Sequence, residues 1–126
     1  MIFVNRFLHT VDTDVVTVDN YRCGYLATEY LIGRGHKRIA HIAGPSTSVT
    51  CRDRTQGYID AMHEHGFTVD RSCVYYGDRR YKSGCEFGAQ IAAMEPEKRF
   101  TAVFSTTGLM AAGMVDTLRS YDQFLN

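Results

Sequence analysis

Short apolar runs alternate with stretches of helical periodicity along this chain, and that alternation constrains the fold more than any other feature. The expected strands are residues 2–5, 14–19, 38–43, 73–76 and 101–105, and a helical pattern follows each of the last four. Repeated βα units place parallel strands in one sheet, because each crossover returns the chain to the same end of the sheet. The sequence therefore predicts an α/β fold with a mainly parallel sheet and helices on both faces.

Residues that commonly cap helices stand at the ends of the helical patterns. The expected N-terminal caps are Asn20, Thr50 (with Asp53), Ser83 (with Glu86) and Thr107, and the expected C-terminal residues are Gly35 and Gly66. Apolar stripes should face the sheet between these ends. They are Cys23, Leu26, Ala27, Tyr30 and Leu31; Cys51, Thr55, Tyr58, Ile59 and Met62; Phe87, Ile91 and Met94; and Met110, Ala111, Met114 and Leu118.

Polar residues gather where the expected strands end and the next helices begin. In open α/β sheets, ligands bind beyond the carboxyl ends of the strands, where the helix N-termini converge. The segments that should form this edge are 5–6, 19–20, 44–54, 77–83 and 105–108. The sequence therefore predicts a polar ligand crevice there.

Composition narrows the class of protein. The 126 residues suit about one domain, and 14 basic residues balance 14 acidic ones, whereas a DNA-binding module usually has a basic excess. No apolar run approaches the roughly 18 residues that span a membrane. Four cysteines without a C-x-x-C pair suit a reducing compartment, so we expect a cytoplasmic protein. His63 and His65 have no third residue at zinc spacing, and no cofactor motif is present, so neither a metal nor a cofactor is expected.

Several motifs recur together along the chain. The longest is YLIGRGHKRIAHIAGP at residues 30–45, followed by RDRTQGY at 52–58. The others are YGD at 76–78, SG at 83–84, TAVF at 101–104 and MAAG at 110–113. Over nearly the whole chain, this set resembles the effector domain of the LacI/GalR family of transcriptional regulators. The fold of that family is similar to that of periplasmic sugar-binding proteins, so the resemblance implies a sensor of a small molecule.

The resemblance also implies a division of the chain. Residues 1–19 would be the end of an N-terminal subdomain with its crossover strand, and residues 20–126 a truncated C-terminal subdomain, with Asp19 and Asn20 at the hinge. A DNA-reading headpiece and the strands that close both subdomains have no counterpart, so we expect an incomplete part of a larger protein. The implied partners are a small effector (a sugar or a sugar derivative), a second copy in a homodimer, and DNA only through the absent headpiece.

Arg54 is the first candidate for binding the effector. It lies one turn into the helix that Thr50 is expected to cap, and helical side chains lean toward the N-terminus, which aims its guanidinium at the crevice. The position matches the effector-gripping arginine of the family. The alternative is a surface arginine paired with Asp53 or Asp60. Thr50 can use its hydroxyl for the cap, the ligand or both, and Arg52 is a further candidate that points to a different helix face.

Three more candidates lie on other strand ends. Asn5 stands where the family places an Asp or Asn for ligand hydroxyls, with an Asx turn as the alternative. Arg79 stands where relatives often present an aromatic or polar side chain; it can bind the ligand or lie in a solvated loop, and Tyr81 is the aromatic alternative. Thr107 stands where the family commonly has an amide, and this departure weakens the transfer of a specific sugar preference.

The sequence lacks the combinations that catalysis needs. It has no nucleophile with a base, no Gly-x-Gly-x-x-Gly loop and no Walker lysine, so an enzyme is not expected. The serious alternative is a sugar-binding protein of an uptake system, which shares the fold. A helix-turn-helix segment at the start of the gene would favour the regulator and a signal peptide the uptake protein. For the regulator, we expect effector binding to change the orientation of the subdomains and thereby the affinity for the operator.

Overall fold

The computed structural model describes residues 19–121, and in them three parallel strands form one sheet. The central strand, β1 (Ile39–Ala43), lies between β2 (Val74–Tyr76) and β3 (Ala102–Ser105). Each of these strands was expected at its place, and the ends differ by a single residue. The expected strands at 2–5 and 14–19 lie outside the described residues, apart from Asp19.

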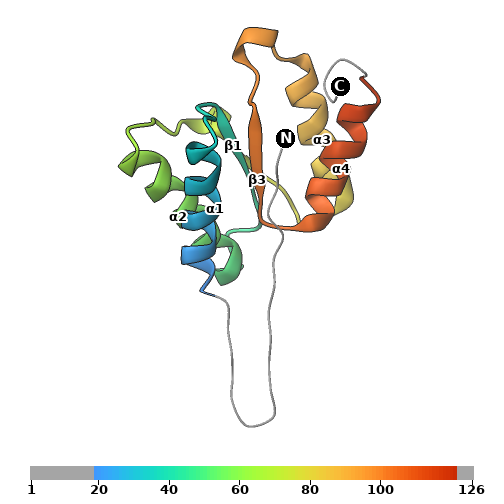
Figure 1. Ribbon diagram of the computed structural model, residues 1–126. Helices are drawn as coiled ribbons and strands as arrows, with labels where there is room; N and C mark the ends of the chain where they lie inside the picture. The colour runs from blue at the N-terminus through green and yellow to red at the C-terminus, as the bar shows by residue number, and fades with distance from the viewer. Residues whose placement is uncertain (1–18, 122–126) are drawn as a thin grey trace.

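Two pairs of helices enclose the sheet. Helices α1 (Asn20–Gly33) and α2 (Val49–Glu64) cover one face, and α3 (Tyr81–Ala93) and α4 (Gly108–Arg119) cover the other (Figure 1). Two short 3₁₀ turns, Arg71–Cys73 and Pro96–Lys98, precede β2 and β3. The predicted parallel sheet with helices on both faces is therefore confirmed.

A hydrophobic core lies on each side of the sheet. All five residues of β1 are buried, as expected for a parallel strand covered on both faces. Ala40 and Ile42 pack with side chains of α3 and α4, whereas Ile39 packs with side chains of α1 and α2. Alternate residues of β1 thus serve opposite cores, which ties the two helix pairs to one strand.

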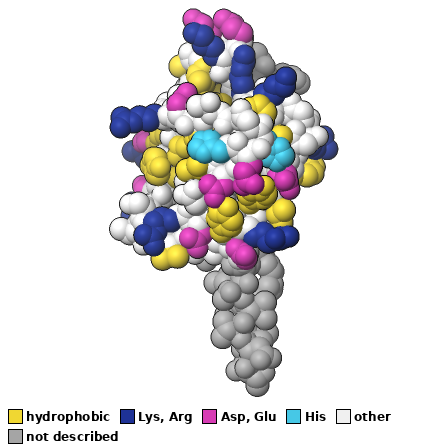
Figure 2. Space-filling model, turned by 90° about the vertical axis from the view of Figure 1, so that its left-hand side faces the viewer, with side chains coloured by type: hydrophobic (Ala, Val, Ile, Leu, Met, Phe, Trp, Pro, Cys, Tyr) yellow, Lys and Arg dark blue, Asp and Glu magenta, His cyan; other side chains and the backbone are white. Residues whose placement is uncertain are grey.

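The predicted stripe on α1 is confirmed at Ala27 and Leu31 and wrong at Leu26 and Tyr30. Leu26 and Tyr30 are 46% and 52% exposed, and Gly24 and Thr28 take the buried face instead. The reason is close helix packing, because a Cβ on Gly24 would overlap the backbone carbonyl of Arg54 in α2. Small residues therefore face α2, and larger ones lie on the surface, among carboxylates and histidines on this side of the molecule (Figure 2).

The predicted stripes on the other three helices agree better with the buried residues. The stripe on α4 is confirmed, with all four of its predicted residues buried. In α2, Thr55 and Ile59 are only half-buried, while Arg54, Gly57 and Ala61 join the buried face. In α3, Met94 follows the helix and is half-buried. A pattern of apolar residues alone does not identify a glycine or an arginine as a buried position.

Three of the four predicted N-terminal caps are wrong. The side chain of Asp19, not Asn20, accepts the hydrogen bond that caps α1, from the Arg22 N–H at 3.0 Å. Ser48, not Thr50, caps α2, because a turn after Pro45 starts this helix two residues early. The predicted cap Ser83 is the third residue of α3, which follows Arg80 without a side-chain cap.

The remaining caps are confirmed. Thr107 caps α4 by accepting a hydrogen bond from the Met110 N–H at 3.3 Å. Gly35 and Gly66 follow α1 and α2 with φ of +93° and +83°, the left-handed conformation that ends many helices.

Each helix pair is interlocked in the same way. In α1 and α3, a tyrosine precedes a glycine by three residues, and in α2 and α4 a glycine precedes an aspartate by three. The tyrosine hydroxyl donates to the aspartate at 2.6 Å in both pairs, and each glycine lies against a backbone carbonyl of the partner helix. The two sets are Tyr21, Gly24, Gly57 and Asp60, and Tyr81, Gly84, Gly113 and Asp116.

Candidate functional site

The carboxyl ends of the strands and the N-termini of the helices meet at one edge of the sheet (Figure 1). Gly44, after β1, has no room for a side chain, because a Cβ there would overlap Cys51 of α2 and lie 3.5 Å from the hydroxyl of Thr106. Gly77, after β2, is similarly enclosed by Ser83 and Met110. The loops therefore bring the starts of α2, α3 and α4 together, as predicted from the sequence.

Arg54 is the buried charge of this edge. It lies in the second turn of α2, its side chain is 1% exposed, and its Nε donates to Oδ1 of Asn20 at 3.0 Å. The alternative of a surface arginine is therefore wrong. Asp60 accepts from Tyr21 and Gln56 instead, and Asp53 is exposed. Because a buried guanidinium is stable only with polar partners, Asn20 is part of its local structure.

Asn20 is a functional candidate of a kind that the sequence did not reveal. It was expected to cap α1 and to lie at the hinge, but it is the first helical residue, and its side chain turns to α2. Asp19, the other expected hinge residue, is exposed and holds the cap. Asn20 is 34 positions from Arg54 and shares no local motif with it, so no sequence pattern could have paired the two.

Thr50 and Thr107 both place hydroxyl groups at this edge, but of the two only Thr107 caps a helix. Thr50 is half-buried in the first turn of α2, and Ser48 has taken the capping role expected of it. Thr107 is half-buried, and its Oγ1 accepts from the Met110 N–H. Arg52, two residues from Arg54, is exposed on a different face of α2, as its spacing predicted.

Arg79 adopts a backbone conformation that is uncommon for its residue type. Its φ is +73°, and it is the one non-glycine residue with positive φ among those described. The neighbouring turn holds it, because Oδ1 of Asp78 accepts from the Arg80 N–H at 2.9 Å. This bond, with a further one from Ser83, keeps the pKa of Asp78 below its ordinary value. Residues in such strained conformations often lie at functional sites.

The remaining predicted site residue, Asn5, lies outside the described residues.

A buried histidine lies behind the edge. His41 in β1 is stacked between the rings of Tyr58 and Phe104, with both centroids at 4.9 Å. Its Nδ1 donates to the carbonyl of Phe104 at 2.9 Å, so its Nε2 accepts from the hydroxyl of Thr55 at 2.9 Å. Burial lowers the pKa of His41 to about 3. The ring is therefore neutral, and it contacts α2 through Thr55, the residue that follows Arg54.

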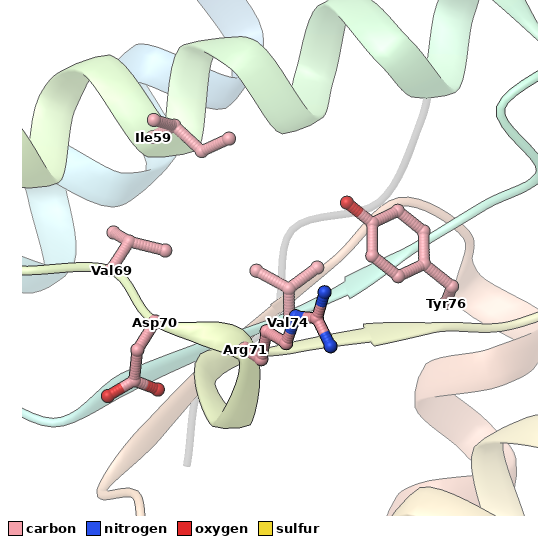
Figure 3. Close-up of a pocket in the computed structure, with 6 residues that line it drawn as sticks. All are labelled: Ile59, Val69, Asp70, Arg71, Val74 and Tyr76. Atoms are coloured by element: carbon pink, nitrogen blue, oxygen red, sulfur yellow. The ribbon is translucent and has the colours of Figure 1, made fainter.

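Two hollows lie between α2 and β2, away from Arg54. One of about 830 Å³ is lined by Ile59 of α2, by Val74 and Tyr76 of β2, and by the loop that joins the two elements (Figure 3). The other, of about 260 Å³, includes Arg52 and Tyr76. Of the predicted site residues, Arg52 alone lines either hollow, which separates it from Arg54.

Two further features of the described residues bear on the function. None of their helices combines the length and the apolar character needed to cross a bilayer. Nor does the described part of the chain hold a group of three or more potential metal ligands in a suitable arrangement.

Known proteins with similar sequences are regulators of transcription. A family model described as periplasmic binding proteins and the sugar-binding domain of the LacI family matches residues 1–123. The chain is 34% identical over 113 residues to the HTH-type transcriptional repressor CytR of Escherichia coli, covering 90% of the chain and 33% of CytR. It is 38% identical over 105 residues to the HTH-type transcriptional regulator CelR of Thermobifida fusca, covering 83% of the chain and 30% of CelR. The chain thus spans about a third of the length of these relatives.

Solved structures of similar fold are also structures of regulatory proteins. A regulatory protein of the LacI family from Chloroflexus aggregans has a TM-score of 0.79 and 33% identity, and the match covers 82% of the chain and 37% of that protein. The complex of the regulator CelR with cellobiose has a TM-score of 0.75 and 38% identity, over 82% of the chain and 31% of that protein.

Proposed function

Because the chain belongs to the family of periplasmic binding proteins and LacI-type sugar-binding domains, we propose that it is the effector-sensing part of a transcriptional regulator. The observation that carries the proposal is the buried Arg54, held by Asn20 at the carboxyl edge of the sheet. A guanidinium is planar and carries its donors as a fork, which suits vicinal hydroxyls or an anion. The protein binds a small polar ligand and does not catalyse a reaction.

The effector is a sugar or a related polar molecule. Arg54 is its main partner, the hydroxyls of Thr50 and Thr107 contribute from the same edge of the sheet, and the guanidinium of Arg79 is presented by its strained backbone. Asn5 contributes from the preceding subdomain. We do not assign Arg52 to the site, because it is exposed on a different face of α2 from the buried Arg54. The CelR complex, in which a relative of similar fold holds cellobiose, supports a carbohydrate ligand.

The ligand acts by changing the relation between two subdomains. Residues 1–19 belong to the N-terminal subdomain and residues 20–126 to the C-terminal one, and Asp19 and Asn20 lie where the chain passes between them. An effector that contacts both subdomains favours one orientation only by its differential affinity for it. In a cytoplasmic homodimer, this orientation sets the spacing of two DNA-reading headpieces, which lie outside this chain.

The test compares two matched variants in the full-length product of the gene. Arg54→Met removes the buried charge, and Arg52→Met makes the same change on the exposed face of the same helix. Binding of cellobiose, glucose 6-phosphate, adenine and inorganic phosphate is measured by calorimetry, and operator binding by a mobility-shift assay.

We expect Arg54→Met to weaken the binding of the compound that binds best by at least about tenfold, because a hydrogen bond to a charged group is lost. Arg52→Met should bind it as the unmodified protein does, and both variants should keep binding the operator. Equal binding by both variants would refute the role of Arg54. A full-length product that has a signal peptide and no operator affinity would instead identify an uptake protein.

A further inference from the structure

Asn20 joins two parts of the chain that have different tasks in the proposed function. It is the first residue of α1, immediately after the expected crossover, and it is half-buried. Its Oδ1 accepts the Nε–H of Arg54 at 3.0 Å, across 34 residues of sequence. This side-chain hydrogen bond connects the start of α1 to the arginine of the proposed ligand site.

The backbones around this bond have little freedom to move. A Cβ on Gly24 of α1 would overlap the carbonyl of Arg54, and a Cβ on Gly57 of α2 would overlap the carbonyl of Tyr21. The hydroxyl of Tyr21 also donates to Asp60 at 2.6 Å. Because Tyr21 and Gly24 hold α1 in register with α2 immediately after Asn20, its side chain has a fixed place from which to hold Arg54.

Arginine has a long side chain with several rotatable bonds, so burial alone does not fix the plane of its guanidinium. A bond to Nε fixes that plane, since Nε lies at the base of the planar group. It thereby sets the direction of the Nη1–Nη2 edge, which can form two parallel bonds to a carboxylate, a phosphate or vicinal hydroxyls. An arginine already oriented loses less side-chain entropy when the ligand binds.

We propose that Asn20 is a positioning residue, which holds the guanidinium of Arg54 ready for the effector and links that guanidinium to the crossover between the subdomains. The proposal rests on the function proposed above. It means that the crossover senses the ligand through Arg54 and Asn20, since a change in the direction of the guanidinium must move the first turn of α1 or break the bond.

The competing explanation is that Asn20 only holds two helices together. The structure contains a control for it, because Tyr21–Asp60 is a second hydrogen bond between the same helices and does not involve Arg54. If both bonds serve packing alone, their loss should have the same consequences. If Asn20 positions Arg54, its loss alone should affect ligand binding.

The experiment uses Asn20→Ala, Asn20→Asp and Tyr21→Phe in the full-length product. Asn20→Asp retains an oxygen acceptor at the same place, and Tyr21→Phe removes the packing bond only. Binding of the four compounds named above is measured by calorimetry, and the melting temperature of each variant is recorded. The hydrogen exchange of the Arg54 Nε–H is followed by NMR, which needs no ligand.

We expect Asn20→Ala to weaken binding by about tenfold, the typical effect of losing one hydrogen bond to a charged group. Asn20→Asp should restore binding, and Tyr21→Phe should bind normally with a similar or larger loss of melting temperature. The Arg54 Nε–H should exchange faster in Asn20→Ala and stay protected in the other two variants.

Normal binding by Asn20→Ala, or an equal loss in Tyr21→Phe, would overturn the proposal, as would an Nε–H whose exchange does not respond to Asn20→Ala. Failure of the unmodified protein to bind any of the four compounds would count against the proposed function. The exchange measurement would still decide whether Asn20 holds Arg54.

Discussion

The neutral His41 should make the stability of this protein depend on pH in a range where its other buried groups do not titrate. In the folded protein, burial between Tyr58 and Phe104 lowers the pKa of His41 from 6.5 to about 3. In the unfolded chain, the ring binds a proton as the pH falls below 6.5, whereas the folded protein does not. Acid therefore favours the unfolded state, and stability falls with pH below about 6.5.

The size of the effect follows from the two pKa values. A difference from 6.5 to about 3 corresponds to about 5 kcal/mol when the pH has fallen below both values. By pH 5, about 2 kcal/mol of the unfolding free energy should be lost relative to pH 7.5. The lowered pKa values of Asp60, Asp70 and Asp78 destabilise the fold in acid as well, but only near and below their ordinary value of 3.8.

The assay is urea unfolding at pH 7.5, 6.5, 5.5 and 5.0, followed by circular dichroism because the chain has no tryptophan. His41→Gln is the control, since glutamine can donate and accept hydrogen bonds but does not titrate. Its stability at pH 7.5 will be lower, but its loss between pH 7.5 and 5 should be about 2 kcal/mol smaller than that of the unmodified chain. Parallel curves for the two proteins would show that His41 is not the buried neutral group described here.

The remaining predictions concern packing and capping, and all are measured as unfolding free energies at pH 7.5. Gly57→Ala should lose about 2 kcal/mol or more because its Cβ meets the Tyr21 carbonyl, whereas Gly33→Ala, where the space is open, should not be destabilised. Ser48→Ala should lose about 1 kcal/mol of capping energy, and a larger loss in Thr50→Ala would contradict the assignment of the cap. Tyr58→Phe should lose about 1 to 2 kcal/mol, because the carbonyl of Ile39 loses a buried donor at 2.6 Å; an unchanged stability would contradict this hydrogen bond.

The sequence was sufficient for the layers of the fold because these depend on periodicity. The strands around β1 and the buried residues of α4 follow from apolar runs and spacing, and the structure has them where they were expected. The glycines after α1 and α2 were also predictable, since a left-handed residue after a helix has a strong local preference. These features are set by interactions between neighbours in the chain.

What the sequence did not predict depends on contacts between distant residues. Leu26 and Tyr30 were expected on the buried face of α1 because they are apolar. They are exposed because α1 packs closely against α2, and this contact requires Gly24 on the buried face. The partner of Arg54 was missed for the same reason, since Asn20 lies 34 residues away. Local capping signals compete within a few residues of one another, and Ser48 prevailed over Thr50 because of a turn that starts at Pro45.

The same interlock occurs in both helix pairs, so equivalent positions in the two pairs can be compared. In α2, Arg54 supplies the carbonyl that lies against the glycine of α1, and in α4 Met110 supplies the equivalent carbonyl against Gly84 of α3. Both side chains are buried, but Met110 belongs to a hydrophobic core whereas Arg54 carries a charge. Since a methionine occupies the equivalent position in the other pair, the interlock of two helices does not by itself require an arginine there.

We therefore predict the outcome of a double-mutant cycle at Asn20 and Arg54. Arg54→Met alone should lose about 1 to 3 kcal/mol of unfolding free energy, because a hydrogen bond to a charged group is lost and the half-buried amide of Asn20 is left without this donor. Adding Asn20→Ala removes that amide, so the loss in the double variant should be smaller than the sum of the two single losses, with a coupling energy of at least about 1 kcal/mol. The double variant should also fail to bind the effector. Strictly additive losses would mean that the two side chains do not depend on each other, and would contradict the hydrogen bond between them.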